Sequence, residues 1–272
     1  MEVTAENRRL VGRVAARLAA AGCVAPEAEA DALLAAAPDE AALDDLVARR
    51  ERGEPIAWLI AQARFGDLDV AVSAGVFVPR EQSEELARRA ASLLPPAGLA
   101  VDLCTGSGAV AAHLASVAPG AVVVGADLDE GAAACALANG VPSFVADVAL
   151  APLRDGAFDI VTAIAPYVPT GDLRLLPSDV QRYEPRLALD GGDDGLDLVR
   201  RVVATAARLL RPGGWLLVEV GGRQDELLAA DLAAAGFEQG HPWHDEDGDL
   251  RGLAARLRAT QDVRSNKEAR AQ

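Results

Sequence analysis

The fold is decided by one stretch of eight residues, Val101-Asp102-Leu103-Cys104-Thr105-Gly106-Ser107-Gly108. An apolar run leads into a loop with two glycines, and the residues that follow, 108–117, have the character of a helix. Glycine lets a backbone approach a ligand closely, and the start of a helix presents free N–H groups. The stretch therefore predicts a buried strand, a ligand-binding loop and a helix in direct succession.

Strands and helices continue to alternate around this stretch. We expect strands at 99–103, 121–126, 143–145, 159–163 and 215–220, and helices at 108–117, 130–138, 196–210 and 224–235. Residues 237–257 could form a closing antiparallel pair. Such alternation is typical of a mostly parallel sheet with helices on both faces. We therefore predict an α/β fold with seven strands, one of them antiparallel near the end.

The residues before this core have a different pattern. Residues 1–52 are rich in Ala, Leu, Glu and Arg, with apolar positions at helical spacing, and predict a small bundle of three helices. Residues 53–80 should form a linker with a β-hairpin of strands 69–72 and 76–78. The main domain would span 81–260, and the polar residues 261–272 would be a disordered tail.

Composition excludes several classes of protein. The formal net charge of −15 repels phosphate, so we expect no direct nucleic-acid binding. The three cysteines, Cys23, Cys104 and Cys135, are too few and too scattered for a disulfide framework or a zinc site, and we expect no metal. There is no apolar run near the ~20 residues of a membrane span, and the first residues do not resemble a secretion signal. These features favour a cytoplasmic protein.

An acidic residue follows the glycine loop at a spacing that is typical of a ribose-binding carboxylate. Asp127 lies 19 residues past Gly108, at the end of the next expected strand, where a carboxylate can accept two hydrogen bonds from ribose hydroxyls. The loop could instead be an ordinary tight turn, and Asp127 could cap a helix. Asp147 and Val148 follow the third expected strand, where an adenine edge could lie, although Asp147 could also be a surface residue.

The loop is compatible with two kinds of cofactor, a nicotinamide dinucleotide and S-adenosylmethionine. Gly106-x-Gly108-x-x-Ala111 satisfies the dinucleotide fingerprint of nicotinamide oxidoreductases, which is a weak signal by itself. Asp102 at the strand end suits an ammonium group better than a pyrophosphate, and the chain has no evident hydride-transfer residues. These two features favour S-adenosylmethionine.

A series of motifs resembles the glutamine-N5 protein methyltransferases (HemK/PrmC-type), which methylate a glutamine in release factors or in a ribosomal protein. In order they are Glu54-Pro55-Ile56-Ala57-Trp58, Val76-Phe77-Val78-Pro79-Arg80, the 102–108 loop, Asp127, Tyr183-Glu184-Pro185-Arg186, Gly191-Gly192-Asp193-Asp194-Gly195-Leu196 and Glu219-Val220-Gly221. The resemblance implies a Rossmann-like class I methyltransferase fold, a helical N-terminal domain that engages a protein substrate, and S-adenosylmethionine as cofactor. It carries cofactor binding onto Asp102, Cys104, Thr105, Gly106, Ser107, Gly108 and Asp127. Asp147 and Val148 complete the predicted cofactor site because of their place after the third expected strand.

The family's Asn-Pro-Pro-Tyr motif is altered in this chain. In the family, the Asn side chain and the next backbone carbonyl hold the glutamine amide nitrogen. Here the segment reads Ile164-Ala165-Pro166-Tyr167, so the catalytic positions would be Ala165, Pro166 and Tyr167, with Ile164 where Asn is expected. Isoleucine cannot accept a hydrogen bond, which leaves two hypotheses: a methyltransferase with an uncertain acceptor, or a catalytically silent relative that binds cofactor or partner.

Other departures are smaller. The family's Pro-Arg-Pro-Glu-Thr-Glu segment reads Pro79-Arg80-Glu81-Gln82-Ser83-Glu84, and two family glycines appear as Ala61 and Cys104. Cys104 should be a small loop residue and not a nucleophile. Glu184 could shape the entrance for the substrate, or could form an internal salt bridge that holds a loop.

Overall fold

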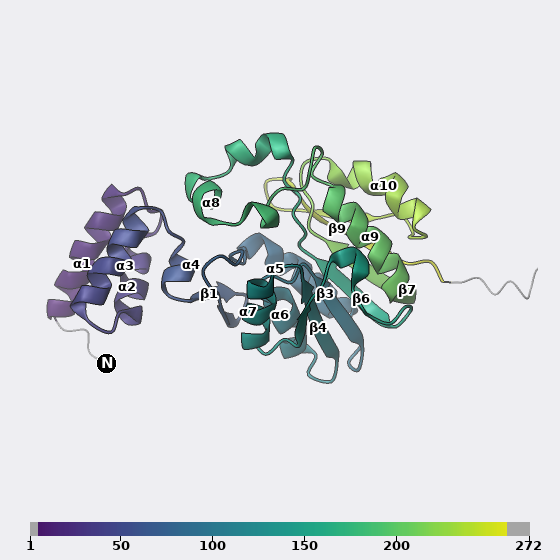
Figure 1. Ribbon diagram of the computed structural model, residues 1–272, viewed down its shortest axis with the longest axis horizontal. Coiled ribbons are helices and arrows are strands. Elements are labelled where there is room, and N and C mark those ends of the chain that lie inside the picture. The colour runs from purple at the N-terminus through teal and green to yellow at the C-terminus, as the bar shows by residue number, and fades with distance from the viewer. Residues whose placement is uncertain (1–4, 260–272) are drawn as a thin grey trace, which may run out of the picture.

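The computed structural model describes residues 5–259, so the expected disordered tail at 261–272 lies outside the described residues. The chain begins with three helices, α1 (Ala5–Ala20), α2 (Pro26–Ala36) and α3 (Glu40–Glu51). Their apolar faces meet in a small core of their own, around Leu18, Leu33 and Val47. Figure 1 shows this group at one end of the molecule, beside the larger α/β body. Within the described residues, no helix is long and apolar enough to cross a membrane.

A short hairpin connects the two parts, but not with the predicted strands. After α4 (Ile56–Leu59), strand β1 (Gln62–Phe65) pairs with β2 (Leu68–Ala71) in antiparallel register. The prediction that 76–78 is the second strand of the hairpin was wrong. Gly66, with φ of 55°, makes the turn, so residues 69–71 pair with the preceding strand, β1, and not with residues 76–78. Residues 76–78 form no strand, because Trp58 Nε1 donates to the Val76 carbonyl (2.9 Å) and the Val76 side chain packs on Ala132 and Cys135.

The body is a seven-stranded sheet in the order β5-β4-β3-β6-β7-β9-β8. Its strands are β3 (Leu99–Leu103), β4 (Val122–Asp127), β5 (Ser143–Val145), β6 (Phe158–Ala163), β7 (Leu210–Val218), β8 (His241–His244) and β9 (Leu250–Arg256). The first five strands in this order are parallel, and β9 runs antiparallel to both β7 and β8. The predicted α/β class, with one antiparallel strand near the end, is confirmed.

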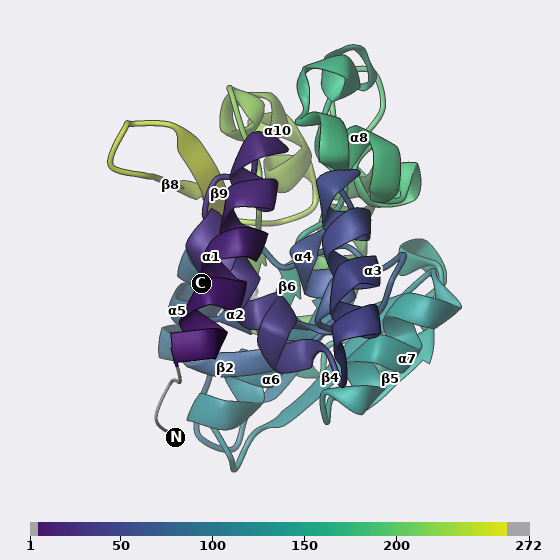
Figure 2. The ribbon, with the colours of Figure 1, turned by 90° about the vertical axis from the view of Figure 1, so that its left-hand side faces the viewer.

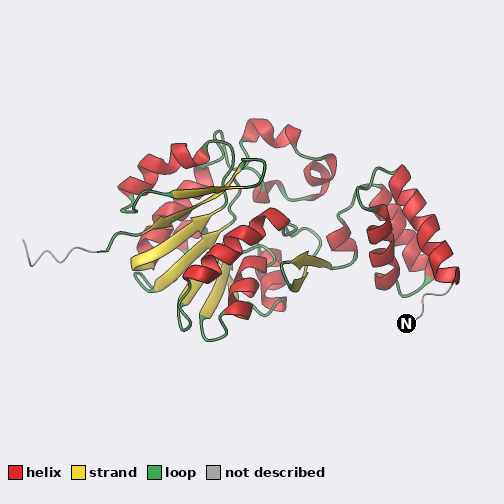
Figure 3. Ribbon diagram, turned by 180° about the vertical axis from the view of Figure 1, so that it is seen from behind, coloured by secondary structure: helices red, strands yellow, loops and turns green. Residues whose placement is uncertain are grey.

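Helices cover both faces of the sheet (Figure 3). They are α5 (Glu84–Leu93), which follows a turn of 3₁₀ helix at Glu81–Ser83, α6 (Ala109–Val117), α7 (Glu130–Ala138), α9 (Asp197–Leu209) and α10 (Gln224–Ala234). Because side chains alternate along a strand, each strand serves two cores. Ile160 packs with the core of α5 and α6, whereas its neighbour Val161 packs with the core of α9 and α10.

A long connection between β6 and α9 was not predicted from the sequence. It holds a 3₁₀ helix at Thr170–Leu175, α8 (Ser178–Tyr183) and a last turn at Arg186–Ala188. It lies on the side of the body that faces the N-terminal helices, as Figure 2 also shows. Tyr183 Oη donates to the Arg52 carbonyl (3.1 Å), and the Tyr183 ring meets Trp58 edge to face. This connection therefore contacts both the end of α3 and helix α4.

Candidate functional site

One cavity opens at the carboxyl ends of β3, β4, β5 and β6, where the loops after these strands converge. Together with the open space at its mouth, it has a volume of about 1180 Å³. We call residues 102–107, 127–129 and 146–148 its glycine-loop side, and residues 75–83, 164–166 and 185–188 its Ile164 side. Ten of the predicted site residues line it: Asp102, Cys104, Thr105, Gly106, Ser107, Asp127, Asp147, Val148, Ile164 and Pro166. Gly108, Ala165 and Tyr167 are not among the lining residues.

The two loop glycines have different tasks. Gly106 has a φ of 56°, and a Cβ built on it would meet nothing within 4 Å, so its backbone faces open space in the cavity. Gly108 also has a positive φ, of 80°, but a Cβ there would lie 2.8 Å from the Ala136 Cβ. Gly106 is thus the glycine that leaves room for a ligand, and Gly108 lets α6 pack closely on α7.

Asp127 braces the loop from the neighbouring strand. Its Oδ2 accepts the Gly106 N–H (2.8 Å) and its Oδ1 accepts the Asp129 N–H (3.0 Å). Because the Gly106 N–H is used in this way, it is not available to a ligand, whereas no hydrogen bond among the described residues uses the Ser107 N–H. The N–H groups of the first turn of α6 also lack partners within the helix. Each carboxylate oxygen of Asp127 has a second lone pair, which can accept a further hydrogen bond. Asp127 was predicted from the sequence as a ribose ligand, but its hydrogen bond to the loop was not predicted.

Asp102 is held inside the protein. It is 2% exposed, and it accepts hydrogen bonds from Thr105 Oγ1 (2.8 Å) and Thr162 Oγ1 (2.7 Å). Burial raises the pKa of Asp102 to about 6, although the two hydroxyls favour the charged form. The carboxylate therefore fixes the start of the loop as well as lining the cavity.

Cys104 occupies a backbone conformation that favours glycine. Its φ is 56°, and Ala61, with φ of 54°, is the other non-glycine residue at positive φ among the described residues. These are the two positions where the motif comparison expects glycine. Burial, with a smaller contribution from Asp127, raises the pKa of the Cys104 thiol. A thiol that stays protonated is a poor nucleophile, so the structure agrees with the interpretation of Cys104 as a small loop residue.

An arginine that the sequence did not reveal completes the glycine-loop side. Arg201, on α9, lines the cavity and forms an ion pair with Asp147, whose Oδ1 also accepts the Ala149 N–H (2.8 Å). Arg201 lowers the pKa of Asp147 and keeps it ionised. The charged lining residues are four aspartates, Asp102, Asp127, Asp129 and Asp147, and two arginines, Arg80 and Arg201. Both arginines are paired, so the cavity favours a cation over a phosphate.

The Ile164 side is mostly apolar. Ile164 lines it and also packs against the core of α5 and α6, while Ala165 is buried. Among the described residues, no hydrogen bond uses the carbonyl oxygens of Ile164 or Ala165. Of Ile164 and Ala165, therefore, only the backbone carbonyls could accept a hydrogen bond from a ligand N–H.

Tyr167 is part of a buried polar cluster. Glu219, which is 3% exposed, accepts Tyr167 Oη (2.8 Å) and Gln82 Nε2 (3.0 Å) on Oε1 and Ser83 Oγ (2.6 Å) on Oε2. Burial and the Glu219 carboxylate raise the pKa of Tyr167, which stays a neutral donor. We call Gln82, Ser83, Tyr167 and Glu219 the Glu219 cluster. It joins three segments that are far apart in the sequence, and none of these contacts was predicted.

Arg80 and Glu184 connect two walls of the cavity. They form an ion pair, and the Arg80 guanidinium lies 4.9 Å from the centre of the Phe77 ring. Glu184 is buried, which raises its pKa against the opposing effect of Arg80. The interpretation of Glu184 as an internal salt bridge is therefore correct, and its neighbour Pro185 lines the cavity.

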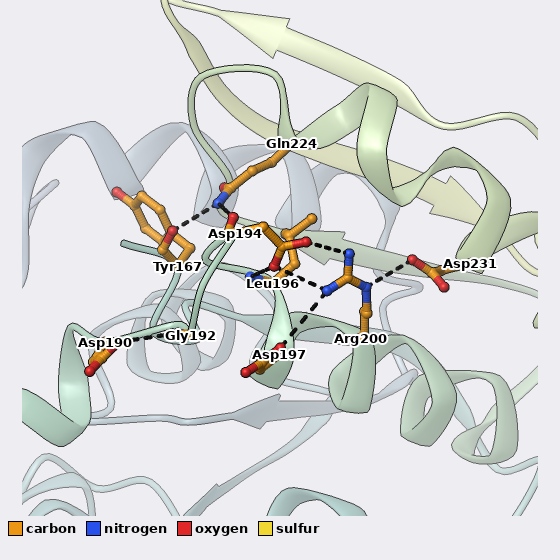
Figure 4. A network of polar contacts seen from close by, with 9 residues as sticks. All are labelled: Tyr167, Asp190, Gly192, Asp194, Leu196, Asp197, Arg200, Gln224 and Asp231. Carbon is orange, nitrogen blue, oxygen red and sulfur yellow. Dashed lines mark hydrogen bonds and ion pairs between the residues drawn. The ribbon is translucent and has the colours of Figure 1, made fainter. Parts of the chain in front are cut away.

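The Gly191–Leu196 loop supports the segment after β6 from behind (Figure 4). Gln224 Nε2 donates to the carbonyls of Tyr167 (2.8 Å) and Asp194 (3.1 Å). A Cβ on Gly195 would lie 2.2 Å from the Tyr167 carbonyl oxygen, so only glycine fits there. Arg200 fixes the far side of the loop through Asp194 (2.7 Å) and Asp231 (3.1 Å). The loop thereby fixes the backbone that carries Ile164 and Pro166.

Comparison with known sequences gives consistent matches. Residues 101–167 match the family model of a methyltransferase domain. A release factor glutamine methyltransferase from Geobacter sulfurreducens is 38% identical over 227 residues, which are 81% of this chain and 80% of the relative. Another, from Moorella thermoacetica, is 38% identical over 84% of this chain and 89% of the relative.

Solved structures show the same fold at lower identity. A T. thermophilus 16S rRNA methyltransferase (RsmC), in complex with AdoMet and guanosine, has a TM-score of 0.51 and 18% identity over 72% of this chain. The match covers 44% of that chain, which is less than half of its length. An E. cuniculi complex that methylates the translation termination factor eRF1 has a TM-score of 0.50 and 20% identity over 68% of this chain and 99% of that one.

Proposed function

Because the chain belongs to the release factor glutamine methyltransferase family, we propose that it methylates the side-chain amide nitrogen of a glutamine in a release factor. The chain is an S-adenosylmethionine-dependent methyltransferase with a Rossmann-like class I fold. The single observation that supports this acceptor best is the family match over most of the chain. The cavity described above supports it further.

The glycine-loop side fits the cofactor. We infer that its amino-acid part lies along Cys104, Thr105, Gly106 and Ser107, where a Cβ at Gly106 would point into open space. Asp127 would accept the ribose hydroxyls on the lone pairs that the backbone leaves free. The adenine would lie at Asp147 and Val148. A cavity with four aspartates and two paired arginines suits a cationic sulfonium and ammonium better than a pyrophosphate, which argues against the nicotinamide alternative.

The bound cofactor supplies an electrophilic methyl group on a sulfonium. Methyl transfer to the amide nitrogen would form one N–C bond and break one S–C bond, and it would release S-adenosylhomocysteine and one proton to the solvent. The task of this chain is to place that nitrogen, and placement can account for about 7–11 kcal/mol of a barrier. The carbonyl of Ala165, which no hydrogen bond among the described residues uses, would accept one amide N–H, and the lining residues Phe77 and Pro79 would exclude water. Pro166 lines the same cavity.

The test is methyl transfer from S-adenosylmethionine to a purified bacterial release factor, with the modified residue located by mass spectrometry. We expect one methyl group on one glutamine side chain. A release factor in which that glutamine is replaced by glutamate is the matched control, because it keeps the shape and removes the amide nitrogen. Cofactor binding without any methylated glutamine would contradict the proposal.

Ile164 favours a second candidate function, a silent relative that binds cofactor and partner without turnover. Burial of an amide N–H beside Ile164 without a hydrogen-bond acceptor would cost about 1–3 kcal/mol in binding free energy, because the N–H loses its hydrogen bond to water. The same experiment separates the candidates, because a silent relative would bind S-adenosylmethionine and the release factor in calorimetry and transfer nothing.

We further propose that the α1–α3 bundle engages the protein substrate and that the chain acts in the cytoplasm. The bundle has its own small core, and its end at Arg52 contacts α8 beside the cavity. A surface that carries a net charge of −15 argues against direct binding to nucleic acid.

A further inference from the structure

Among the described residues of the Ile164 side that line the cavity, Ser83 carries the one uncharged side chain that can accept a hydrogen bond. The other side chains of that side which line the cavity are apolar, apart from Arg80, which is a donor only. Ser83 lies at the end of the 3₁₀ turn before α5 and is 1% exposed. An amide that enters this apolar space therefore meets a single side-chain acceptor.

The orientation of this hydroxyl is fixed. Ser83 Oγ donates its only proton to Glu219 Oε2 at 2.6 Å, a charge-assisted bond. Its two lone pairs then have no hydrogen-bond donor among the described residues. The negative partner also increases the electron density on Oγ, which makes it a better acceptor.

The same cluster brings Ser83 to the altered motif. Glu219 Oε1 accepts Tyr167 Oη at 2.8 Å, and Tyr167 is three residues past Ile164. Ser83 is thus connected through two hydrogen bonds to the segment that carries Ile164 and Pro166, and all three residues line one cavity.

We propose that the Ser83 hydroxyl supplies the side-chain acceptor that Ile164 lacks, and holds one N–H of the glutamine amide during methyl transfer. This inference rests on the proposed function. Ser83 would be a catalytic residue, since it touches the substrate, and Glu219 would be a positioning residue that acts through it. The carbonyl of Ala165 would hold the second N–H.

The test is a double-mutant cycle with the release factor as acceptor. Ser83→Ala should lower kcat about 10²-fold and change the KM for S-adenosylmethionine less than about twofold, because one preorganised hydrogen bond is lost. Ser83→Thr keeps the hydroxyl and should stay within about fivefold of the wild type. Ser92→Ala is the matched control, since Ser92 lies on the exposed side of α5 and bonds only the Arg89 carbonyl.

The cycle uses Ile164→Asn as its second background. The introduced amide oxygen is an acceptor at the family position, so Ser83→Ala should cost less than about tenfold there. A purely structural role of Ser83 would give the same loss in both backgrounds and would overturn the inference. Should Ser83→Ala not fold, Ser83→Cys replaces it, and its weak sulfur acceptor should cost at least about tenfold.

The outcomes separate the two proposals. A wild type that methylates glutamine while Ser83→Ala keeps its kcat overturns the role of Ser83 alone. A wild type that methylates no glutamine overturns the proposed function, and it also shows that Ser83 does not replace the missing acceptor.

Discussion

The two sides of the cavity are built in different ways. On the glycine-loop side, Asp102 bonds Thr105 within the same loop, and Asp127, at the end of the neighbouring strand β4, bonds Gly106. On the Ile164 side, Glu219 joins side chains that lie 52 to 137 residues away in the sequence. The first side is fixed by local backbone geometry, and the second by long-range contacts among side chains. A change such as isoleucine in place of asparagine at position 164 can therefore alter the Ile164 side while the glycine-loop side keeps its structure.

The largest effect should follow from removal of the carboxylate of the Glu219 cluster. Glu219→Ala leaves three donors without their acceptor in a buried position, so we expect a loss of about 3 kcal/mol in the free energy of unfolding. Urea denaturation measures it. Glu226→Ala is the control, because its ion pair with Arg223 is exposed to solvent and should leave the free energy of unfolding close to that of the wild type. If the two sides are independent, the folded variant keeps its affinity for S-adenosylmethionine.

The matching change on the other side is Asp127→Ala. Loss of two charge-assisted ribose contacts, together with the brace on Gly106, should weaken S-adenosylmethionine binding by about 2–3 kcal/mol in titration calorimetry. Asp67→Ala, at a fully exposed turn, should bind as the wild type does. Unchanged affinity in Asp127→Ala would mean that the ribose lies elsewhere.

Asp102 gives the glycine-loop side a dependence on pH. Its pKa in the folded protein is about 6, above the ordinary value of 3.8, so the folded state binds more protons than the unfolded state between these values. The contribution of Asp102 to stability therefore falls as pH rises from about 4 to 6, by about 1–3 kcal/mol, and is constant above that range. We expect Asp102→Asn to gain stability relative to the wild type over this range in urea denaturation. A constant difference between pH 4 and 6 would contradict the raised pKa.

The smallest effect concerns the backbone at Cys104. A non-glycine residue in the left-handed region costs about 1–2 kcal/mol, and glycine adds an entropic cost of about 0.5–1 kcal/mol. Cys104→Gly should therefore stabilise the protein by up to about 1 kcal/mol in thermal unfolding. Ala61→Gly offers the same change outside the cavity and should give a similar gain. A loss in both would show that neither backbone is strained.

The sequence predicts most of the sheet because the signals are local. Strands 99–103 and 143–145 and helix 130–138 have the bounds that periodicity indicates. The hairpin was mispredicted because residues 69–71 could pair either with the segment before them or with residues 76–78 after them. The turn at Gly66 selects the preceding strand, 62–65. On the cavity side, Asp127 could be found by its spacing from the glycines. Arg201, Ser83 and Glu219 could not be placed, because no spacing in a sequence predicts which distant side chains a fold brings together.

The place of β9 between β7 and β8 has a consequence for synthesis. During translation, β3 finds its neighbours β4 and β6 early, but the outer edge of β7 stays unpaired until residues 250–256 have been made. An unpaired edge of apolar residues such as Leu216 and Leu217 is a template for pairing with another chain. Aggregation of nascent chains should therefore be greatest in the interval between the appearance of β7 and that of β9, and a stop codon placed there should give insoluble protein.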